Sequence, residues 1–186
     1  SRQGEVKRLG GILADAAARL AVARPHIKFV TPVATPALRP LIERQIEEAG
    51  IADRFTLLDG NSETAMMAAD VVLLASGTAA LESALLSKPT VAIYRLARMT
   101  HAIAIGMRLV KLTHYTLPNL LTVEPLVPEL MQQNATPEAI AGAVTGMLDD
   151  PERRRFIAGE FAKLRSELAL NADQRAADAV LAVMAS

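Results

Sequence analysis

Four short apolar segments rich in β-branched residues alternate with segments of helical periodicity, and this alternation constrains the fold more than any other feature of the chain. The strand-like segments are Ile27–Val33, Phe55–Leu58, Val71–Ala75 and Thr90–Tyr94. Strands that alternate with helices in this way form a parallel sheet with helices packed on its faces. We therefore predict an α/β fold, with the continuously apolar Val71–Ala75 as a central strand buried on both faces.

The helices of the first half begin and end at recognisable residues. Thr35 before Pro36 predicts a helix start, Gly50 predicts the end of that helix, and Ser62 predicts the cap of a shorter one. The first helix has no strand before it, unlike the others, so we expect a preceding strand to be missing from this sequence. The predicted helices are Glu5–Ala23, Pro36–Ala49, Ser62–Ala69, Thr78–Ser87 and Met99–Val110.

The second half of the chain changes from alternating segments to mainly helical ones. An extended piece near His114–Leu117 is followed only by segments of helical periodicity, with Thr136 and Asp150 as caps before prolines. We expect residues 1–150 to form the α/β domain. Residues 151–186 have no strands left to cover, so we expect them to pack on an absent domain or a partner chain. The predicted helices are Leu126–Gln133, Pro137–Leu148, Pro151–Leu168 and Asp173–Met184.

The composition excludes several classes of function. Lys plus Arg and Asp plus Glu number 20 each in 186 residues, and Cys is absent. The balanced charge argues against a sequence-independent grip on nucleic acid, and the lack of cysteine excludes disulfides, thiolate metal sites and thiol nucleophiles. The apolar runs are too short to span a bilayer and no charged-then-apolar leader opens the sequence. We therefore expect a soluble or peripheral protein of the cytoplasm.

The turn Ala75-Ser76-Gly77-Thr78 is the strongest local signal for a ligand site, because an apolar strand ends there and a helix begins. Free N–H groups at the helix start and the hydroxyls of Ser76 and Thr78 can bind a phosphate, and Gly77 allows close approach of the backbone. Glu82 lies one helical turn after Thr78 on the same face, where its carboxylate can accept hydrogen bonds from both hydroxyls of a ribose. An ordinary capped turn followed by a solvated glutamate remains the simpler alternative.

Further segments, taken in order, resemble one family over essentially the whole chain. They are Ser1-Arg2-Gln3-Gly4-Glu5-Val6, Ala69-Asp70, Ala75–Glu82, Tyr94-Arg95, Leu117-Pro118-Asn119-Leu120-Leu121, Val127-Pro128-Glu129-Leu130 with Gln132, and Asn171-Ala172-Asp173. The ordered set resembles the donor half of bacterial lipid-A-disaccharide synthases. This resemblance implies a Rossmann-like parallel sheet with helices on both faces, the C-terminal half of a twin-Rossmann (GT-B) glycosyltransferase, with a helical C-terminal tail.

The resemblance also implies a reaction and a set of binding residues. Such an enzyme transfers 2,3-diacylglucosamine from UDP to 2,3-diacylglucosamine 1-phosphate with inversion, forming lipid A disaccharide 1-phosphate and UDP. By likeness to the family, Arg2 faces the diphosphate, Ser76, Gly77 and Thr78 bind the phosphates, Glu82 binds the ribose, and Asn119 lies at the donor site. Tyr94, Arg95, Glu129 and Gln132 are assigned to the region of the site only.

The resemblance places the general base and most of the acceptor surface in an N-terminal half that this chain does not contain. We therefore expect no catalytic residue here and no turnover by this chain alone. The three histidines, His26, His101 and His114, are scattered and give no metal-ligand spacing, so we expect no cofactor and a metal-independent reaction. The expected partners are UDP-2,3-diacylglucosamine, UDP, the acceptor lipid through the missing half, the inner membrane face through peripheral contact, and a second copy in a homodimer, but not nucleic acid.

Three alternatives remain open at this stage. The basic residues of 94–111 (Arg95, Arg98, Arg108 and Lys111) contact a membrane or an acceptor phosphate, or they are solvated ends of a core helix. Another UDP-sugar enzyme of the same architecture, such as a non-hydrolysing epimerase, shares the phosphate turn and the ribose acid but not the segments at 117–121 and 127–132. A non-catalytic flavodoxin-like module predicts an acidic pocket at the first strand ends, and no such cluster is visible.

Overall fold

The computed structural model describes residues 3–75, 77–95, 114–169 and 172–184. Two of the predicted binding residues, Arg2 and Ser76, lie outside these ranges. The predicted helix Met99–Val110 also lies outside them, together with most of the basic stretch of residues 94–111.

All strand pairs of the described residues are parallel, which confirms the predicted α/β class. One sheet pairs β1 with β2, and the other has the order β3-β4-β5. The strands are β1 (Phe29–Val33), β2 (Phe55–Asp59), β3 (Val72–Ala75), β4 (Thr90–Tyr94) and β5 (Glu129–Met131).

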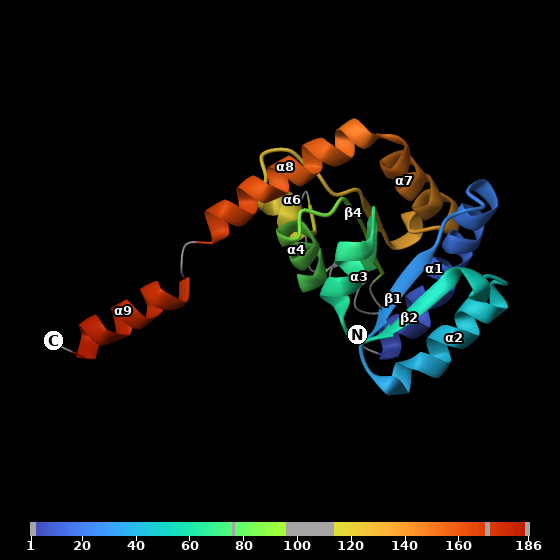
Figure 1. Cartoon of the computed structure of the whole chain (residues 1–186), viewed down its shortest axis with the longest axis horizontal. Helices are drawn as coiled ribbons and strands as arrows, with labels where there is room; N and C mark the ends of the chain where they lie inside the picture. Colours follow the sequence, from blue (N-terminus) through green and yellow to red (C-terminus); the bar gives the residue numbers. More distant parts are fainter. Residues whose placement is uncertain (1–2, 76, 96–113, 170–171, 185–186) are drawn as a thin grey trace, which may run out of the picture.

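Helices cover both faces of these sheets, as predicted (Figure 1). The α-helices are α1 (Gln3–Ala23), α2 (Arg39–Glu48), α3 (Ser62–Ala68), α4 (Thr78–Leu85), α6 (Leu117–Leu121), α7 (Pro137–Asp149), α8 (Pro151–Leu168) and α9 (Ala172–Met184); the 3-10 helices are η1 (Pro36–Leu38), η2 (Ala52–Arg54) and η3 (Gln132–Asn134). None of the helices in the described ranges combines the length and the apolar character needed to cross a membrane.

Alternate residues of β3 show how the two faces are covered. Val72 and Leu74 pack in one core cluster with residues of α3, α4 and α8. Leu73 and Ala75 point to the opposite face, where they pack with residues of α1 and α7. Because successive side chains of a strand alternate between faces, this division places α1 and α7 on one side of the sheet and α3, α4 and α8 on the other.

The predicted helix Leu126–Gln133 is wrong, because this segment forms the strand β5 and the 3-10 helix η3. Its backbone pairs with β4 in a register that aligns Ala92 with Glu129. Pro128 lies inside the segment and cannot donate a helical hydrogen bond. The apolar residues of this segment have helical spacing, but its proline disfavours a helix. Pairing with β4 therefore determines its structure.

Two further expectations about the elements need correction. The strand with a neighbour on each side is β4, whose first four residues are all buried, whereas β3 pairs with β4 alone among the described residues. The expected cap Ser62 is instead the first residue of α3, because Asn61 adopts the left-handed conformation one residue earlier. The caps Thr136 and Asp150 are confirmed: the Thr136 hydroxyl accepts from the Ala139 N–H and the Asp150 carboxylate accepts from the Arg153 N–H.

The helix α8 packs on this domain, contrary to the expectation that both closing helices contact something else. Ile157 and Phe161 are fully buried in the cluster that contains Leu74 and Ala84. Apolar residues at spacings of four along α8 thus complete the core over α4. In contrast, α9 stands apart from the body of the domain in Figure 1, and the expectation stays a prediction for that helix.

We expect Phe161→Ala to lower the free energy of unfolding by about 3–5 kcal/mol, because a fully buried ring leaves a cavity beneath α8. Phe156→Ala is the matched control on the same helix, since that ring is 44% exposed and contacts the Arg153 guanidinium. Phe156→Ala is expected to lower the free energy of unfolding by less than about 1 kcal/mol. Denaturant unfolding measures both, and equal effects would mean that α8 does not pack as described.

Candidate functional site

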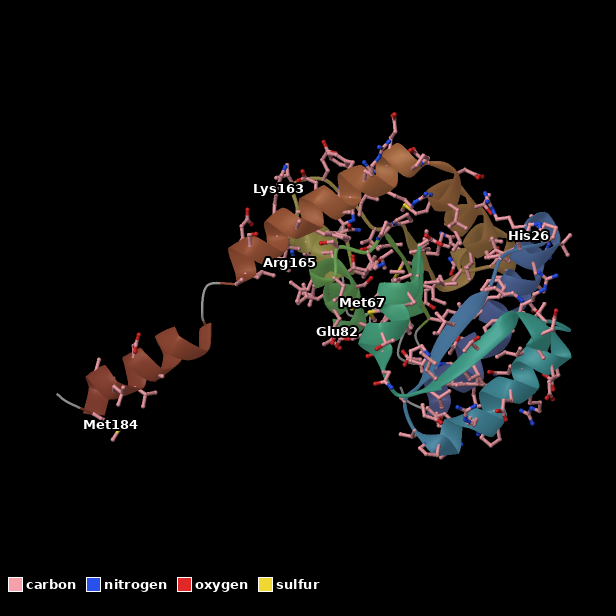
Figure 2. All side chains as sticks on the ribbon, viewed as in Figure 1. His26, Met67, Glu82, Lys163, Arg165 and Met184 are labelled. Carbon is pink, nitrogen blue, oxygen red and sulfur yellow. The ribbon has the colours of Figure 1, made fainter. Side chains whose placement is uncertain are left out.

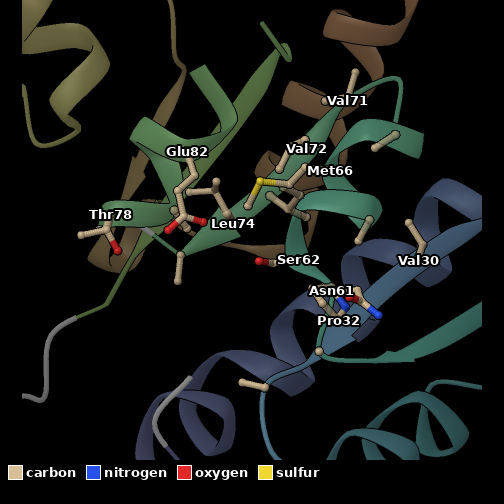
Figure 3. Close-up of a pocket in the computed structure, with 18 of the residues that line it drawn as sticks. Val30, Pro32, Asn61, Ser62, Met66, Val71, Val72, Leu74, Thr78 and Glu82 are labelled. Carbon is tan, nitrogen blue, oxygen red and sulfur yellow. The ribbon is translucent and has the colours of Figure 1, made fainter. Parts of the chain in front are cut away.

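A pocket of about 510 Å³ opens between β1 and β3, and three of the predicted binding residues line it. Gly77, Thr78 and Glu82 come from the start of α4, and Asn61 and Ser62 face them from the start of α3 (Figure 3). This rim lies at the carboxyl ends of the strands, which is where ligands bind in open parallel sheets.

The backbone at Gly77 turns the chain from β3 into α4. Gly77 is the residue before the first turn of α4 and has φ 151° and ψ −154°, a conformation that side-chain-bearing residues rarely adopt. Its carbonyl accepts the first helical bond from the Ala80 N–H at 3.2 Å. The N–H groups of the first turn have no partner within a helix, and the positive end of the helix dipole lies there. An anion bound at this turn would therefore be stabilised by these groups.

Thr78 and Glu82 present two polar side chains on one exposed face of α4. They are four residues apart, so they lie one turn from each other on the same side of the helix. Figure 3 shows both side chains on the α4 side of the pocket, with the Ser62 hydroxyl across from them. This places a hydroxyl donor at the helix start and a carboxylate acceptor one turn further on.

Three other predicted residues, Tyr94, Arg95 and Gln132, lie together at the carboxyl ends of β4 and β5. The Arg95 guanidinium donates from Nε to the Gln132 carbonyl at 3.0 Å. Gln132 has φ 52°, and its Nε2 is buried with no hydrogen-bond partner among the described residues. Because β3, β4 and β5 are parallel neighbours, this group shares a sheet edge with Gly77. None of the three lines the pocket.

Asn119 is held in a buried network that uses its whole hydrogen-bonding capacity. Its Oδ1 accepts from the N–H groups of Leu126 and Val127, each at 2.8 Å. Its Nδ2 donates to the Val127 carbonyl at 2.8 Å and to Glu129 Oε1 at 2.9 Å. An amide side chain has two donor hydrogens and two acceptor lone pairs, and all four are used here. In this structure Asn119 fixes the loop after α6, and its predicted contact with a ligand stays a prediction.

Glu129 is the second member of this network and anchors the segment before α6. Its Oε1 accepts from the Thr116 N–H at 2.8 Å and from the Thr116 hydroxyl at 2.7 Å, and its Oε2 accepts from the Tyr115 N–H at 3.0 Å. His114 Nδ1 lies 3.8 Å from the same carboxylate, whose side chain is only 10% exposed. Glu129 thus positions a chain segment, and its assignment to the region of the site stays a prediction.

The connection between β2 and α3 forms a wall of the site that was not predicted from the sequence. Gly60 (φ 67°) and Asn61 (φ 54°) both adopt left-handed backbone conformations and line the pocket with Ser62. The signal was present, because Gly-Asn-Ser directly after a strand is typical of a turn at the carboxyl edge of a sheet. In the described ranges no group of three or more His, Cys, Asp or Glu side chains is placed to hold a metal ion.

Comparisons with known proteins show which proteins this chain is similar to. A family model described as lipid-A-disaccharide synthetase matches residues 1–183. Lipid-A-disaccharide synthases of Alkalilimnicola ehrlichii and Pseudomonas savastanoi are 42% and 45% identical over 98% and 99% of this chain, which covers 47% of each relative. The chain therefore spans about half the length of these curated relatives.

One solved structure shows the same fold. The crystal structure of WaaG, a glycosyltransferase involved in lipopolysaccharide biosynthesis, superposes with a TM-score of 0.55 at 17% identity, over 91% of this chain and 44% of that one. At this identity the likeness shows the fold alone. It confirms the predicted Rossmann-like half of a GT-B protein.

We expect Asn119→Ala to lower the free energy of unfolding on the order of 3 kcal/mol, because two backbone N–H groups and one carbonyl lose buried partners. Asn134→Ala is the matched control, since this asparagine is exposed in η3; its effect should stay below about 0.5 kcal/mol. Thermal or urea unfolding gives both values. A fully stable Asn119→Ala protein would contradict a structural role for this residue.

Proposed function

The chain belongs to the lipid-A-disaccharide synthetase family, and from this premise we infer that it is the sugar-nucleotide-binding half of an inverting glycosyltransferase. The reaction we propose for the whole protein transfers 2,3-diacylglucosamine from UDP to 2,3-diacylglucosamine 1-phosphate. The products are lipid A disaccharide 1-phosphate and UDP. The observation that carries the assignment of the donor site is the arrangement of Gly77, Thr78 and Glu82 around one pocket at the carboxyl edge of the sheet.

The chemistry of this rim suits a nucleoside diphosphate. The diphosphate would lie at the start of α4, where first-turn N–H groups and the Thr78 hydroxyl can donate to its oxygens. The ribose would lie one turn along α4, where the Glu82 carboxylate can accept from its two hydroxyls. By likeness to the family, the Ser76 hydroxyl and the Arg2 guanidinium are also proposed to contact the diphosphate. Tyr94, Arg95 and Gln132, at the neighbouring strand ends, are proposed to contact the sugar side of the donor.

The role of this half in the reaction is to stabilise the leaving group. An acceptor hydroxyl attacks the anomeric carbon and loses its proton to a base in the other half of the protein. The bond from the anomeric carbon to the β-phosphate oxygen breaks, and UDP leaves with an additional negative charge. Donors already aimed at the diphosphate stabilise that charge in the transition state, so we propose a reaction that requires no metal ion.

The remaining proposals concern the surroundings of the protein. We propose that it works in the cytoplasm, at the inner face of the membrane, because its substrates carry acyl chains. We propose that α9 packs on the other half of the protein or on a second copy in a homodimer. The exposed apolar side chains of α9, including Leu181 and Met184, support such a contact.

We expect the chain of residues 1–186 to bind UDP with EDTA present and to form no disaccharide from UDP-2,3-diacylglucosamine and its acceptor, because the general base is proposed to lie elsewhere. Isothermal calorimetry measures the binding and a radiolabelled product assay measures turnover. A loss of UDP affinity on chelation would contradict the proposal that binding requires no metal ion. Product formation by this chain alone would overturn the division between the two halves.

We expect Glu82→Ala to weaken UDP binding by roughly 10- to 100-fold, because charge-assisted hydrogen bonds to the ribose are worth about 1.5–3 kcal/mol. Glu82 is exposed on α4, so folding should be unchanged. Glu167→Ala is the matched control, since it removes an exposed helical glutamate of α8 that does not line the pocket. Calorimetry on the three proteins gives the comparison.

A second nucleotide separates the ribose role from general electrostatics. The unaltered protein should bind 2′-deoxy-UDP more weakly than UDP, whereas Glu82→Ala should bind the two almost alike. Loss of a negative charge near a diphosphate would, by electrostatics alone, tighten the binding of both nucleotides. Equal or tighter UDP binding by a folded Glu82→Ala protein would mean that Glu82 is only a solvated helix residue.

A further inference from the structure

A second pocket, with a volume of about 480 Å³, lies at the amino edge of the sheet. Asp70 and Pro89, which come just before β3 and β4, line one side of it, and the start of α8 lines the other. Of its described lining residues only Ala69 also lines the larger pocket. The reaction proposed above makes no use of this second pocket, because the donor is placed beyond the opposite ends of the same strands.

One face of α8 is turned toward this pocket and carries two guanidinium groups. Pro151, Arg154, Arg155 and Ala158 line the pocket, and their spacing of three and four residues places them on a single side of the helix. The adjoining face of α8, which includes Phe161, is buried over α4. Packing of that face therefore fixes the rotation of α8 at which both arginines reach the pocket.

The third cation of the pocket is Lys88, in the turn between α4 and β4. Its Nζ donates to the Met67 carbonyl at 2.6 Å and to the Ala69 carbonyl at 3.0 Å. These two carbonyls lie at the end of α3, where a helix leaves carbonyl groups without helical partners. The Lys88 ammonium is thus held in one place by backbone groups.

Backbone carbonyls hold the two arginines as well. Arg154 donates from Nη1 to the carbonyls of Met147 and Leu148, in the last turn of α7, and Arg155 donates from Nε to the Pro151 carbonyl at 3.3 Å. A carbonyl oxygen carries only a partial charge, so these bonds position the cations without neutralising them. Within the described ranges none of the three cations forms an ion pair with a carboxylate.

Each cation keeps N–H donors that these bonds do not use. An ammonium has three donor hydrogens and a guanidinium has five. The carbonyl bonds use two donors of Lys88, two of Arg154 and one of Arg155, so one, three and four donors remain. The volume of the pocket lies within the range of small-molecule sites, about 300–1,000 Å³.

We propose that this pocket binds the phosphate group of a small ligand. Its described lining carries three positive charges and one negative charge, from Asp70. A phosphate monoester carries about −1.5 to −2 charges near pH 7, so it matches this excess. The two guanidinium groups offer planar pairs of N–H donors, which suit phosphate oxygens. Because the carbonyl bonds already hold the three side chains, little side-chain entropy is lost on binding.

A bound phosphate would connect the end of α4 to the start of α8. Lys88 belongs to the end of α4, because its N–H donates to the Ser83 carbonyl at 3.0 Å and its carbonyl accepts from the Thr90 hydroxyl at 2.9 Å. Arg154 and Arg155 belong to α8. A ligand that bridges these groups binds only the folded chain and therefore stabilises the packing of α8 on α4.

Chemical shifts of single amides test this proposal, with inorganic phosphate as the probe and sodium chloride keeping the ionic strength constant. In the protein of residues 1–186, the amides of Asp70, Lys88 and Ala158 should shift in a saturable way, with a Kd on the order of 1 mM for so small a ligand. Amides at the start of α4 report separately on phosphate at the proposed donor turn. The outcome at one site therefore does not depend on the outcome at the other.

Substitutions of opposite sign distinguish a site from a general effect of charge. Arg155→Gln should raise the Kd for phosphate about tenfold, because it removes a charged pair of donors. Its matched control is Arg165→Gln, which removes the same charge in the last turn of α8 (Figure 2), about 15 Å along the helix, and should change the Kd less than about twofold. Asp70→Asn should lower the Kd about threefold, because it removes a repelling carboxylate, whereas its control Glu167→Gln should not.

The source of the phosphate group is decided by two further probes. Glycerol 3-phosphate is a soluble monoester, and vesicles of phosphatidylcholine with or without phosphatidic acid present the same group as a lipid headgroup. Displacement of inorganic phosphate by glycerol 3-phosphate, without vesicle binding, assigns the pocket to a free ligand. Co-sedimentation that requires both phosphatidic acid and Arg155 assigns it to a headgroup.

Two results would overturn the proposal. The first is the absence of a saturable shift at the lining amides, and the second is an equal loss of affinity in Arg155→Gln and Arg165→Gln. Arg155 is exposed and its described bond lies within its own helix, so Arg155→Gln should fold. If it does not fold, Asp70→Asn decides, because a folded Asp70→Asn protein with an unchanged Kd would also contradict the site.

Discussion

Two buried hydroxyls tie α4 to the beginning of β4, and the position of the candidate site depends on this contact. Ser83 Oγ lies 2.7 Å from Thr90 Oγ1, and both residues are fully buried. Thr90 Oγ1 donates its single proton to the Lys88 carbonyl at 2.9 Å, so Ser83 is the donor in the pair. The bond fixes the height and rotation of α4 against the sheet. It thereby sets where Gly77, Thr78 and Glu82 meet the pocket.

A network of side-chain hydrogen bonds holds the irregular part of the domain in place, as strand pairing holds the sheets. Residues 114–128 contain one short helix, so few of their backbone groups can pair within an element. Asn119 and Glu129 supply the partners instead, accepting from four different backbone N–H groups. Glu129 begins β5, which pairs with β4. The sheet thus positions the segment 114–128 through these hydrogen bonds, and α6 within that segment packs against α4.

The sequence predicts those parts of the fold that rest on local chemistry. The strand Thr90–Tyr94 and the helix Pro151–Leu168 have the predicted bounds, because proline, a capping aspartate and an apolar run are local signals. The strand β5 was missed, since its three residues gain their structure only by pairing with β4. The same holds for Asn119: likeness to the family suggested a ligand contact, but only the folded loop shows which backbone groups it bonds.

The two closing helices show why periodicity alone does not place a helix. Both have apolar residues at helical spacing, yet Ile157 and Phe161 of α8 are buried whereas Leu181 and Met184 of α9 are 62% and 78% exposed. The difference lies in what each helix contacts. A single residue, Asp150, connects α7 to α8, and α8 packs against α4, whereas α9 lies beyond the edge of the core (Figure 2). Exposing an apolar face of this kind to water costs free energy, and burial would remove that cost. The apolar face of α9 is therefore a surface suited to burial that the described residues leave uncovered.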